Sequence, residues 1–587
     1  MKKIKFAKYS MYSWLTAALA AVFFIVGLFT LGNPQTTGET FALAREKVAV
    51  YNLTYSDGQT YLKDVYVNVG SIYASEGETV NLLVQTSTSS TSKSWTNLAT
   101  LKLANGDGEG AKDFAFNWSV VAKDMPKKAT TIKRISFSAD ANIEINEIVC
   151  VADNGEKMTL TVNASANAGI KATNMANAFD AQGSFKFSER GYDNLTEEEG
   201  RYLSAIRLIR SGKTSVAESV YSLPEDFNAL ALVFMAFPVW MFGDSAFALR
   251  LTPFIATTLT LIGVYLLFAL LFKKQKYGFV AAVTFALGCL ATTVGRLGAP
   301  YALVTCALIY SLYFMYKFFA KGISSSNVVL GAWNVLLSGL FGGVAIAMDT
   351  VAVVPVVGIL AVFAFGMARQ RRAYILGKEK NIAEYADGSP ERVKAEKIAA
   401  LRYAEKNRAA FGFATLGFVV GTFIFLLVGA VSTYYAYAKT YGADVSFAEI
   451  LWFGLSSAWN ARIQTVSEYN VVLLVCAVAA FVFTTVRVII GFAKKATEQK
   501  SVRVARIYFV LLGGVIFSVL AAALKGAPIL ASSLLFVFVY GFFPLATYSL
   551  ERDGEKGKIG LSDWLLIAVL VAAIVGFVTL VPTMYGL

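Results

Sequence analysis

Apolar runs long enough to cross a membrane recur along this chain, interrupted by one long polar stretch near the N-terminus. The first run covers residues 12–32, and eleven more follow. These lie near residues 226–243, 246–272, 277–295, 299–319, 328–347, 350–367, 410–438, 469–492, 507–524, 527–549 and 563–584. A transmembrane helix needs about 20 predominantly apolar residues. The pattern therefore predicts a polytopic α-helical membrane protein.

The polar stretch, residues 38–165, has a different periodicity. Short runs of alternating polar and apolar residues, such as Val65–Val69 and Val80–Val84, recur about eight times, with turn sequences such as Asp153-Asn-Gly155 between them. Alternation with period two predicts strands with one buried face. We therefore expect an inserted all-β sandwich. Residues 132–160 resemble the closing strands of discoidin-type, galactose-binding-like jelly rolls, a resemblance that implies either a sugar-binding module or a spacer.

Charge predicts which way the chain crosses the membrane. Four lysines precede residue 12, and the loop 368–409 carries eleven Lys or Arg against six Asp or Glu. Positive charge favours the cytoplasmic side. If every apolar run crossed, this loop would lie outside. The short run 226–243, interrupted by Pro238, is therefore predicted to be an interfacial helix. About 11 transmembrane helices then remain, in the plasma membrane, with a cytoplasmic N-terminus and an extracytoplasmic sandwich.

Four parts follow from this pattern. Residues 1–37 form the cytoplasmic N-terminus and first transmembrane helix, 38–165 the sandwich, 166–245 an external loop, and 246–587 a multi-span domain containing the cytoplasmic loop 368–409. Among the 587 residues, 56% are hydrophobic, 16% are charged and none is histidine. This composition excludes a soluble enzyme, a Ser-His-Asp triad and a His-ligated zinc site. The net charge of +13 fits membrane orientation better than nucleic-acid binding.

The external loop contains the residues most suited to chemistry. Glu197, Glu198 and Glu199 stand at the start of a predicted helix, with Thr196 as its N-cap. Carboxylates at this position complement the helix dipole, so a purely structural role explains them. A second interpretation comes from the spacing of the motifs. Glu198-Glu-Gly-Arg-Tyr202 is followed, after about forty residues, by Phe242-Gly-Asp-Ser-Ala-Phe-Ala-Leu-Arg-Leu251 at the start of an apolar run.

This pair of motifs resembles the GT-C class of polyprenyl-phosphate-sugar-dependent glycosyltransferases, in the branch of protein O-mannosyltransferases and aminoarabinose transferases. That branch has a DEGRY-like motif on its first external loop, then two prolines, then FGxxxFxxRL at the second span. Here Glu198 replaces the aspartate, and Ser222-Leu-Pro-Glu-Asp226 keeps a single proline. The turn Gly295–Tyr301 has Arg296 but lacks the acidic residue that often follows it in the family.

The resemblance implies roles for particular residues. Glu198 is expected to be the catalytic base for the acceptor hydroxyl, and Glu199 to orient it or to hold, with Glu198, a divalent cation such as Mg²⁺ or Mn²⁺. Cationic groups would stabilise the departing phosphate. The predicted substrate-binding residues are Arg201, Tyr202, Arg207, Arg250, Arg296, Asp349 and Arg462. Each arginine also has a structural alternative, either an ion pair along a helix or snorkelling at the end of a span.

The predicted function is inverting transfer of a sugar from a polyprenyl-phosphate carrier to an extracytoplasmic protein, lipid or glycan. Two alternatives stay open. The first is a catalytically inactive relative that serves as a scaffold or partner subunit, which the missing proline and acidic residue favour. The second is a transporter, for which paired ionisable groups near the bilayer midplane are expected. The apolar runs carry their charges mostly near the ends, which favours a transferase over a transporter.

Overall fold

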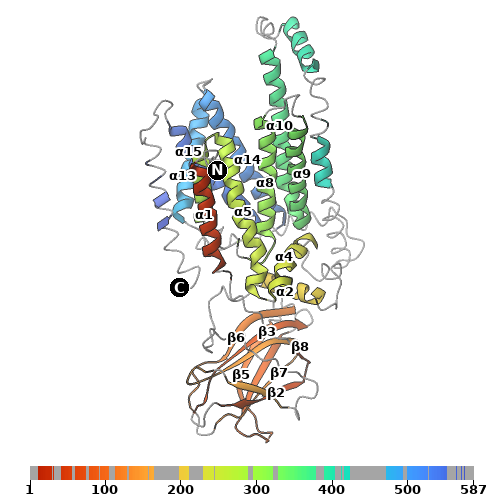
Figure 1. The fold of residues 1–587 in the computed structure, drawn as a ribbon, viewed down its shortest axis with the longest axis vertical. Coiled ribbons are helices and arrows are strands. Elements are labelled where there is room, and N and C mark those ends of the chain that lie inside the picture. Colours follow the sequence, from red (N-terminus) through yellow and green to blue (C-terminus); the bar gives the residue numbers. More distant parts are fainter. Residues whose placement is uncertain are drawn as a thin grey trace, which may run out of the picture.

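A β unit lies at one end of the molecule and a bundle of long helices at the other, with two shorter helices between them (Figure 1). This arrangement is that of a computed structural model. It describes residues 11–29, 31, 41–55, 60–73, 79–91, 93–104, 113–127, 131–156, 158–163, 197–210, 229–243, 245–288, 295, 297–321, 328–378, 389–402, 412, 415–423, 471–493, 499–525 and 528–551, and six single residues between 564 and 575.

The β unit consists of two antiparallel sheets. One has the strand order β1-β8-β3-β6 and the other β5-β4-β7-β2-β9. The strands are β1 (Phe41–Leu43), β2 (Val48–Thr54), β3 (Leu62–Tyr73), β4 (Val80–Ser87), β5 (Thr96–Ala104), β6 (Asp113–Ala122), β7 (Arg134–Ala139), β8 (Asn142–Ala152) and β9 (Thr159–Val162). Neighbours in the chain are often not neighbours in a sheet, so the register depends on contacts that are distant in sequence.

Alternating side chains from both sheets share one hydrophobic core. In β4, for example, Val80, Leu82 and Val84 are buried while the residues between them are half-buried. Tyr51 of β2 and Phe137 of β7 meet edge to face, with ring centroids 6.0 Å apart. The period-two pattern thus places one face of each strand inward, because successive side chains point to opposite faces. The turn at Asp153-Asn-Gly155 uses a positive φ of 83° at Gly155, which glycine adopts without steric cost.

Nearly every predicted apolar run contains a helix. The helices outside the junction with the β unit are α1 (Met11–Leu28), α5 (Ala246–Phe272), α6 (Gln275–Leu287), α8 (Tyr301–Lys321), α9 (Val328–Met348), α10 (Val353–Lys378), α13 (Val471–Ala493), α14 (Gln499–Lys525) and α15 (Pro528–Leu550). A short 3₁₀ turn, η4 (Thr350–Ala352), joins α9 to α10. The runs 410–438 and 563–584 fall mostly outside the described residues.

Five helical segments within the described part of the chain are long and apolar enough to cross a membrane. These are Met11–Leu28, Ala246–Phe272, Tyr301–Ala320, Val472–Ala493 and Lys500–Ala521. Shorter apolar helical segments lie within α4, α9, α10 and α15. A helical membrane protein is therefore confirmed, while the number of eleven spans stays a prediction.

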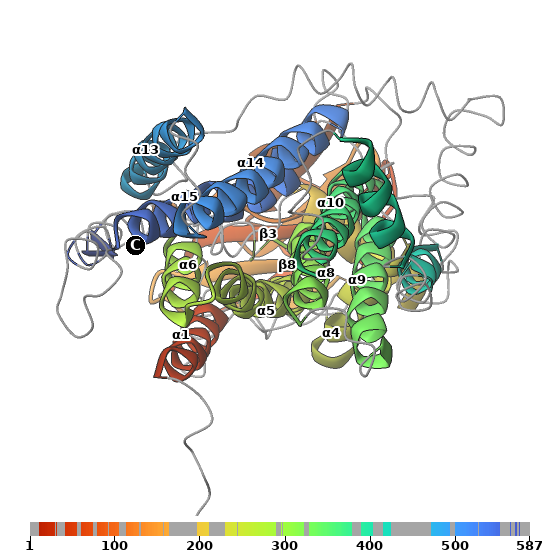
Figure 2. The ribbon, with the colours of Figure 1, turned by 90° about the horizontal axis from the view of Figure 1, so that it is seen from above.

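Helix α5 lies near the centre of the bundle. Seen from above, it stands between α6 and α8, and α1 packs beside it (Figure 2). The helices share one large hydrophobic core, in which Phe268 and Phe272 of α5 are fully buried. Helices α13, α14 and α15 complete the bundle. Because α5 contacts several helices at once, its N-terminal end is a fixed point at the border with the β unit.

The two helices at the border are α2 (Glu197–Arg210) and α4 (Ala229–Phe242). Helix α4 has 14 residues and contains Pro238, so at 1.5 Å per residue it is about 21 Å long and too short to span a bilayer. One face of α4 is buried against α2 and α5, and the other exposes Phe237 (62%) and Trp240 (55%). This shape fits the predicted interfacial helix.

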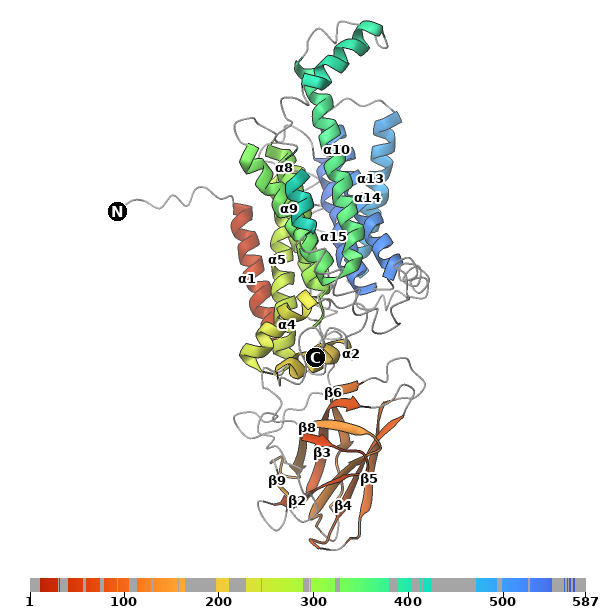
Figure 3. The same cartoon turned by 90° about the vertical axis from the view of Figure 1, so that its right-hand side faces the viewer.

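The basic segments gather at the end of the bundle away from the β unit. Helix α10 extends beyond its neighbours at this end, and the helix of residues 390–402 follows it (Figure 3). Lys274, just before α6, pairs there with Glu551, just after α15, at 2.5 Å. The described residues of the segments predicted to be cytoplasmic therefore lie on the opposite side of the bundle from the β unit.

Candidate active site

The predicted acidic motif lies on α2, at the border between the β unit and the bundle (Figure 1). The helix begins at Glu197, as the sequence predicts. Its buried face carries Tyr202, Leu203 and Ile206, which pack with Leu232 and Met235 of α4. On another side, α2 contacts β6. The acidic end of α2 is thereby placed next to the start of α5.

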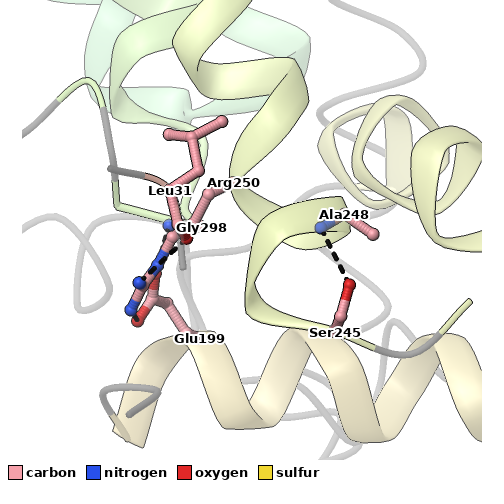
Figure 4. A network of polar contacts seen from close by, with 6 residues as sticks. All are labelled: Leu31, Glu199, Ser245, Ala248, Arg250 and Gly298. Carbon is pink, nitrogen blue, oxygen red and sulfur yellow. Dashed lines mark hydrogen bonds and ion pairs between the residues drawn. The ribbon is translucent and has the colours of Figure 1, made fainter. Parts of the chain in front are cut away.

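Glu199 forms a buried two-point ion pair with Arg250. Arg250 Nε lies 2.6 Å from Glu199 Oε1, and Nη2 lies 2.9 Å from Oε2. The glutamate side chain is 0% exposed and that of the arginine 6%. Parallel N–H···O bonds between guanidinium and carboxylate are among the strongest hydrogen bonds in proteins and fix the relative orientation of both groups. The start of α2 is therefore held rigidly against α5 (Figure 4).

Two backbone groups complete this network (Figure 4). The amide N–H of Gly298 donates to Glu199 Oε1 at 2.7 Å, and Arg250 Nη1 donates to the carbonyl of Leu31 at 3.2 Å. The network joins four segments: helix α2, helix α5, the residue Leu31 just after α1, and the turn before α8. A side chain at position 298 would clash, since a Cβ there would lie 2.8 Å from Leu249 and 3.2 Å from Glu199 Cγ.

The start of α5 follows from its local sequence. Ser245 has an extended backbone and accepts a hydrogen bond from the Ala248 N–H at 3.2 Å. A serine at this position satisfies one of the amide groups that a helix leaves unpaired at its N-terminus. Gly243, with φ of 83°, allows the chain to turn between α4 and α5. The motif Phe242–Leu251 thus contains both the turn and the cap that position Arg250.

The predicted site residues differ in where the structure places them. Glu199 and Arg250 are brought together, and Tyr202 is buried in the hydrophobic contact of α2 with α4. Glu198, Arg201 and Arg207 lie on α2, but their side chains are outside the described part of the structure. Arg296 and Arg462 also lie outside it.

Asp349 occupies the end of α9. Its side chain is buried, and Oδ1 accepts a hydrogen bond from the Val351 N–H at 2.9 Å. Its own N–H donates to the Ala345 carbonyl, which closes the last turn of α9. Asp349 therefore shapes the connection through η4 into α10, which is a structural role for a residue predicted to bind substrate.

Two partners in the network were not predicted from the sequence: the Gly298 amide and the Leu31 carbonyl. Both are backbone groups, so no side-chain motif marks them. In the turn Gly295–Tyr301 the sequence indicates only Arg296 as a candidate site residue. Gly298, two positions after Arg296, is the one sequence feature that could have indicated this contact. Its importance is evident only from the structure, in which Glu199 approaches the backbone closely.

The arrangement fits a metal site poorly. Both oxygens of Glu199 already accept hydrogen bonds, and the charge of Arg250 lies between 2.6 and 2.9 Å away. Among the described residues, no group of three or more His, Cys, Asp or Glu side chains is placed to hold a metal ion. The geometry instead fixes the start of α2, where Glu198 directly precedes Glu199 in the sequence.

Comparison with known proteins bears on this region. Residues 229–380, from α4 into the basic end of α10, match the family of dolichyl-phosphate-mannose-protein mannosyltransferases. The resemblance to GT-C glycosyltransferases drawn from the motifs is therefore confirmed over this segment. The segment includes the motif Phe242–Leu251 and Arg250, while the acidic helix α2 lies just before it. No curated protein sequence matches the chain.

Three solved structures are similar at low identity. The oligosaccharyltransferase of Archaeoglobus fulgidus in the apo form is 12% identical, with a TM-score of 0.37 over 66% of this chain and 52% of that one. AglB from the same organism, in complex with an inhibitory peptide and a dolichol-phosphate, is 14% identical, with a TM-score of 0.37, covering 65% and 52%. ArnT from Cupriavidus metallidurans is 14% identical, with a TM-score of 0.24, covering 60% and 72%. The chain thus spans about half the length of the first two.

Proposed function

We propose that this protein is a membrane glycosyltransferase that transfers a sugar from a polyprenyl-phosphate carrier to an extracytoplasmic acceptor, with inversion at the sugar carbon. The observation that carries the proposal is the acidic helix α2, fixed by the Glu199–Arg250 pair to the start of α5, which lies inside the segment 229–380 that matches the mannosyltransferase family. The proposed donor is a polyprenyl-phosphate hexose. The proposed acceptor is a protein, lipid or glycan presented on the side of the β unit.

In the proposed reaction, the acceptor oxygen forms a bond to the anomeric carbon while the bond from that carbon to the phosphate oxygen breaks. The hydroxyl proton passes to the Glu198 carboxylate, and the polyprenyl phosphate leaves with the electron pair of the broken bond. A base is needed because a neutral hydroxyl is a weak nucleophile. Arg201, Arg207, Arg296 and Arg462 are the proposed partners of the leaving phosphate.

Glu199 and Arg250 receive a different role from the one expected. Since their charges already satisfy each other, we assign them to positioning α2 rather than to contacting the sugar or a cation. Tyr202 packs in the core between α2 and α4, so we assign it to positioning α2 as well. The helix that carries Glu198 is thus held in place from its buried side. Preorganisation of this kind lowers the cost of reaching the transition state.

The test uses the full chain, purified in lipid nanodiscs, with polyprenyl-phosphate hexoses, beginning with mannose, and an envelope extract as acceptor. Transfer of radiolabelled sugar is measured for the wild type, Glu198→Gln and the neighbouring control Glu197→Gln. We expect Glu198→Gln to lose about 10²-fold to 10⁴-fold in rate, as for removal of a general base, and Glu197→Gln to keep its activity. A parallel sample with EDTA, restored with Mg²⁺ or Mn²⁺, tests the cation.

Two results would contradict the proposal. Absence of transfer by the wild type with every donor would favour the inactive scaffold. Full activity of Glu198→Gln would show that Glu198 is not the catalytic base. Folding of each variant is checked by its melting temperature, so that a loss of rate is not a loss of structure.

A further inference from the structure

A group of three arginines lies at the end of the bundle opposite the β unit, far from the acidic helix. Arg369 is on α10, and Arg503 and Arg506 are on α14. Arg506 lies about one helical turn after Arg503, and α14 packs against α10, which carries Arg369. We call Arg369, Arg503 and Arg506 the arginine cluster. Arg369 is exposed and the other two are half-buried.

The packing of α10 against α14 explains why these residues meet. The helices are antiparallel, and Gly358 of α10 faces Phe517 of α14, whose ring would lie 2.7 Å from a Cβ at position 358. Arg369 is eleven residues after Gly358, and Arg506 is eleven residues before Phe517. Eleven residues advance a helix by about 16 Å. The two arginines therefore stand at the same level, three turns from the contact.

The cluster lacks a compensating carboxylate within the described part of the chain. None of the ion pairs described there involves Arg369, Arg503 or Arg506. Glu551, the first acidic residue after α15 in the sequence, forms its ion pair with Lys274. The cluster's surroundings add positive charge: Arg503 Nη1 donates to the Tyr548 hydroxyl at 3.1 Å, and the ammonium groups of Lys274 and Lys500 lie 5.8 Å and 6.0 Å from the Tyr548 ring.

Apolar side chains border the cluster on the side toward the middle of the bundle. Phe365 on α10 and Phe509 on α14 are 71% and 53% exposed, although each lies within a turn of a cluster arginine. Exposed aromatic and aliphatic side chains on apolar helices face lipid in a membrane protein. A cationic group directly above such a surface stands at the level of the lipid headgroups.

We propose that the arginine cluster binds the phosphate of an anionic phospholipid, whose acyl chains lie along the apolar surfaces of α10 and α14. Guanidinium groups suit this ligand because their planar N–H donors match phosphate oxygens. Bound phosphate would offset the positive charge that α10 and α14 carry at this level and so stabilise the packing of α10 against α14. The proposal is independent of the glycosyltransferase activity, which is assigned to the other end of the molecule.

The experiment uses the full chain in detergent. Its melting temperature is measured after addition of phosphatidylglycerol, of phosphatidylcholine with the same acyl chains, or of inorganic phosphate, and bound lipid is counted by native mass spectrometry. We expect phosphatidylglycerol to raise the melting temperature by several degrees and phosphatidylcholine to have a much smaller effect. In Arg369→Gln/Arg506→Gln the apparent affinity for phosphatidylglycerol is expected to fall at least about tenfold, the equivalent of one charged hydrogen bond.

The control Lys394→Gln/Lys397→Gln removes two charges from exposed positions on the helix 390–402, at the same end of the molecule. It should bind phosphatidylglycerol like the wild type. Equal binding by the cluster variant, or an equal loss in the control, would overturn the proposal. A response to inorganic phosphate alone would identify a soluble phosphate rather than a lipid as the ligand. If the double variant does not fold, the exposed Arg369→Gln is used alone, and a loss of affinity for phosphatidylglycerol is still expected.

Discussion

At the scale of single residues, Glu199 is the most deeply buried charged residue among those described. Its carboxylate is compensated by the guanidinium of Arg250. Removing one partner of a buried ion pair leaves an uncompensated charge, which costs about 3–5 kcal/mol. We therefore expect Arg250→Met to lower the melting temperature strongly. Glu199→Gln also leaves the Arg250 charge without its carboxylate, but it should cost less, because the guanidinium keeps its bond to the Leu31 carbonyl and an amide oxygen still accepts from the Gly298 N–H.

The double variant Arg250→Met/Glu199→Gln separates pairing from packing. Since it buries no isolated carboxylate, we expect it to be more stable than Arg250→Met alone, which gives a coupling energy of at least about 1 kcal/mol between the two positions. Thermal denaturation of all four proteins in one detergent measures this coupling. Additive effects of the two substitutions would show that the pair contributes little to the fold.

The sequence indicated both members of this pair but not the pairing itself. The motif Glu198–Tyr202 predicts a catalytic role for Glu199, and the motif Phe242–Leu251 predicts a phosphate-binding role for Arg250. They are separated by 51 residues, and Gly298 is 99 residues from Glu199. Contacts over such separations depend on how α2 docks against α5, and hydrophobic periodicity reports which face of a helix is buried but not against which partner.

At the scale of elements, hydrophobic patterning predicted helices and strands well. The run 246–272 has the same bounds as α5, and the runs Val65–Val69 and Val80–Val84 lie within β3 and β4. The stretch that resembles the closing strands of a jelly roll starts at residue 132, and its first strand, β7, begins two residues later, at Arg134. Strand order could not be predicted, because alternation fixes the inward face of each strand and leaves its neighbours open.

Strand β8 provides a chemical test of the buried core of the β unit. Cys150 is fully enclosed there, and burial raises the pKa of its thiol from 9.0 to about 12. The thiolate is the reactive form, so at pH 8 the native chain should react with iodoacetamide at Cys150 ~10³-fold more slowly than an exposed cysteine. Quantifying the alkylated peptide by mass spectrometry measures this rate. An exposed cysteine in Lys93→Cys serves as the internal control.

The same shift makes stability depend on pH. Because the folded-state pKa of Cys150 is raised, its contribution is complete below pH 9 and is lost as the pH rises from 9 toward 12. Over that window, the free energy of unfolding of the unit containing β8 should fall by up to about 1.4 kcal/mol per pH unit. Cys150→Ala should remove the slope between pH 9 and 10, whereas above pH 10 the buried Tyr51 and Tyr55, whose pKa values burial also raises, add a slope of the same sign. Rapid alkylation of native Cys150, or an unchanged slope in Cys150→Ala, would show that the core of the β unit opens readily.

At the scale of the whole molecule, two chemically different ends are held apart by the apolar bundle (Figure 1). The β unit, α2 and the Glu199–Arg250 pair lie at one end. The start of α1, the arginine cluster and the helix 390–402 lie at the other (Figure 3). Lys and Arg are enriched in the described segments 368–378, 389–402 and 499–506 at that second end. This separation of charge is what the positive-inside rule requires of one cytoplasmic face.

Labelling of cysteines in intact cells tests this orientation. Lys93, in the β unit, and Lys394, on the helix 390–402, are both exposed lysines, one at each end of the molecule. In a background with the native cysteines replaced by alanine, a membrane-impermeant maleimide should label Lys93→Cys in intact cells and Lys394→Cys only after permeabilisation. The polyprenyl-phosphate donor is proposed to meet the acidic helix on the outer face, so the reverse labelling pattern would place Glu198 in the cytoplasm and exclude the proposed extracytoplasmic acceptor. Labelling of both positions in intact cells would instead contradict a bundle that separates two compartments.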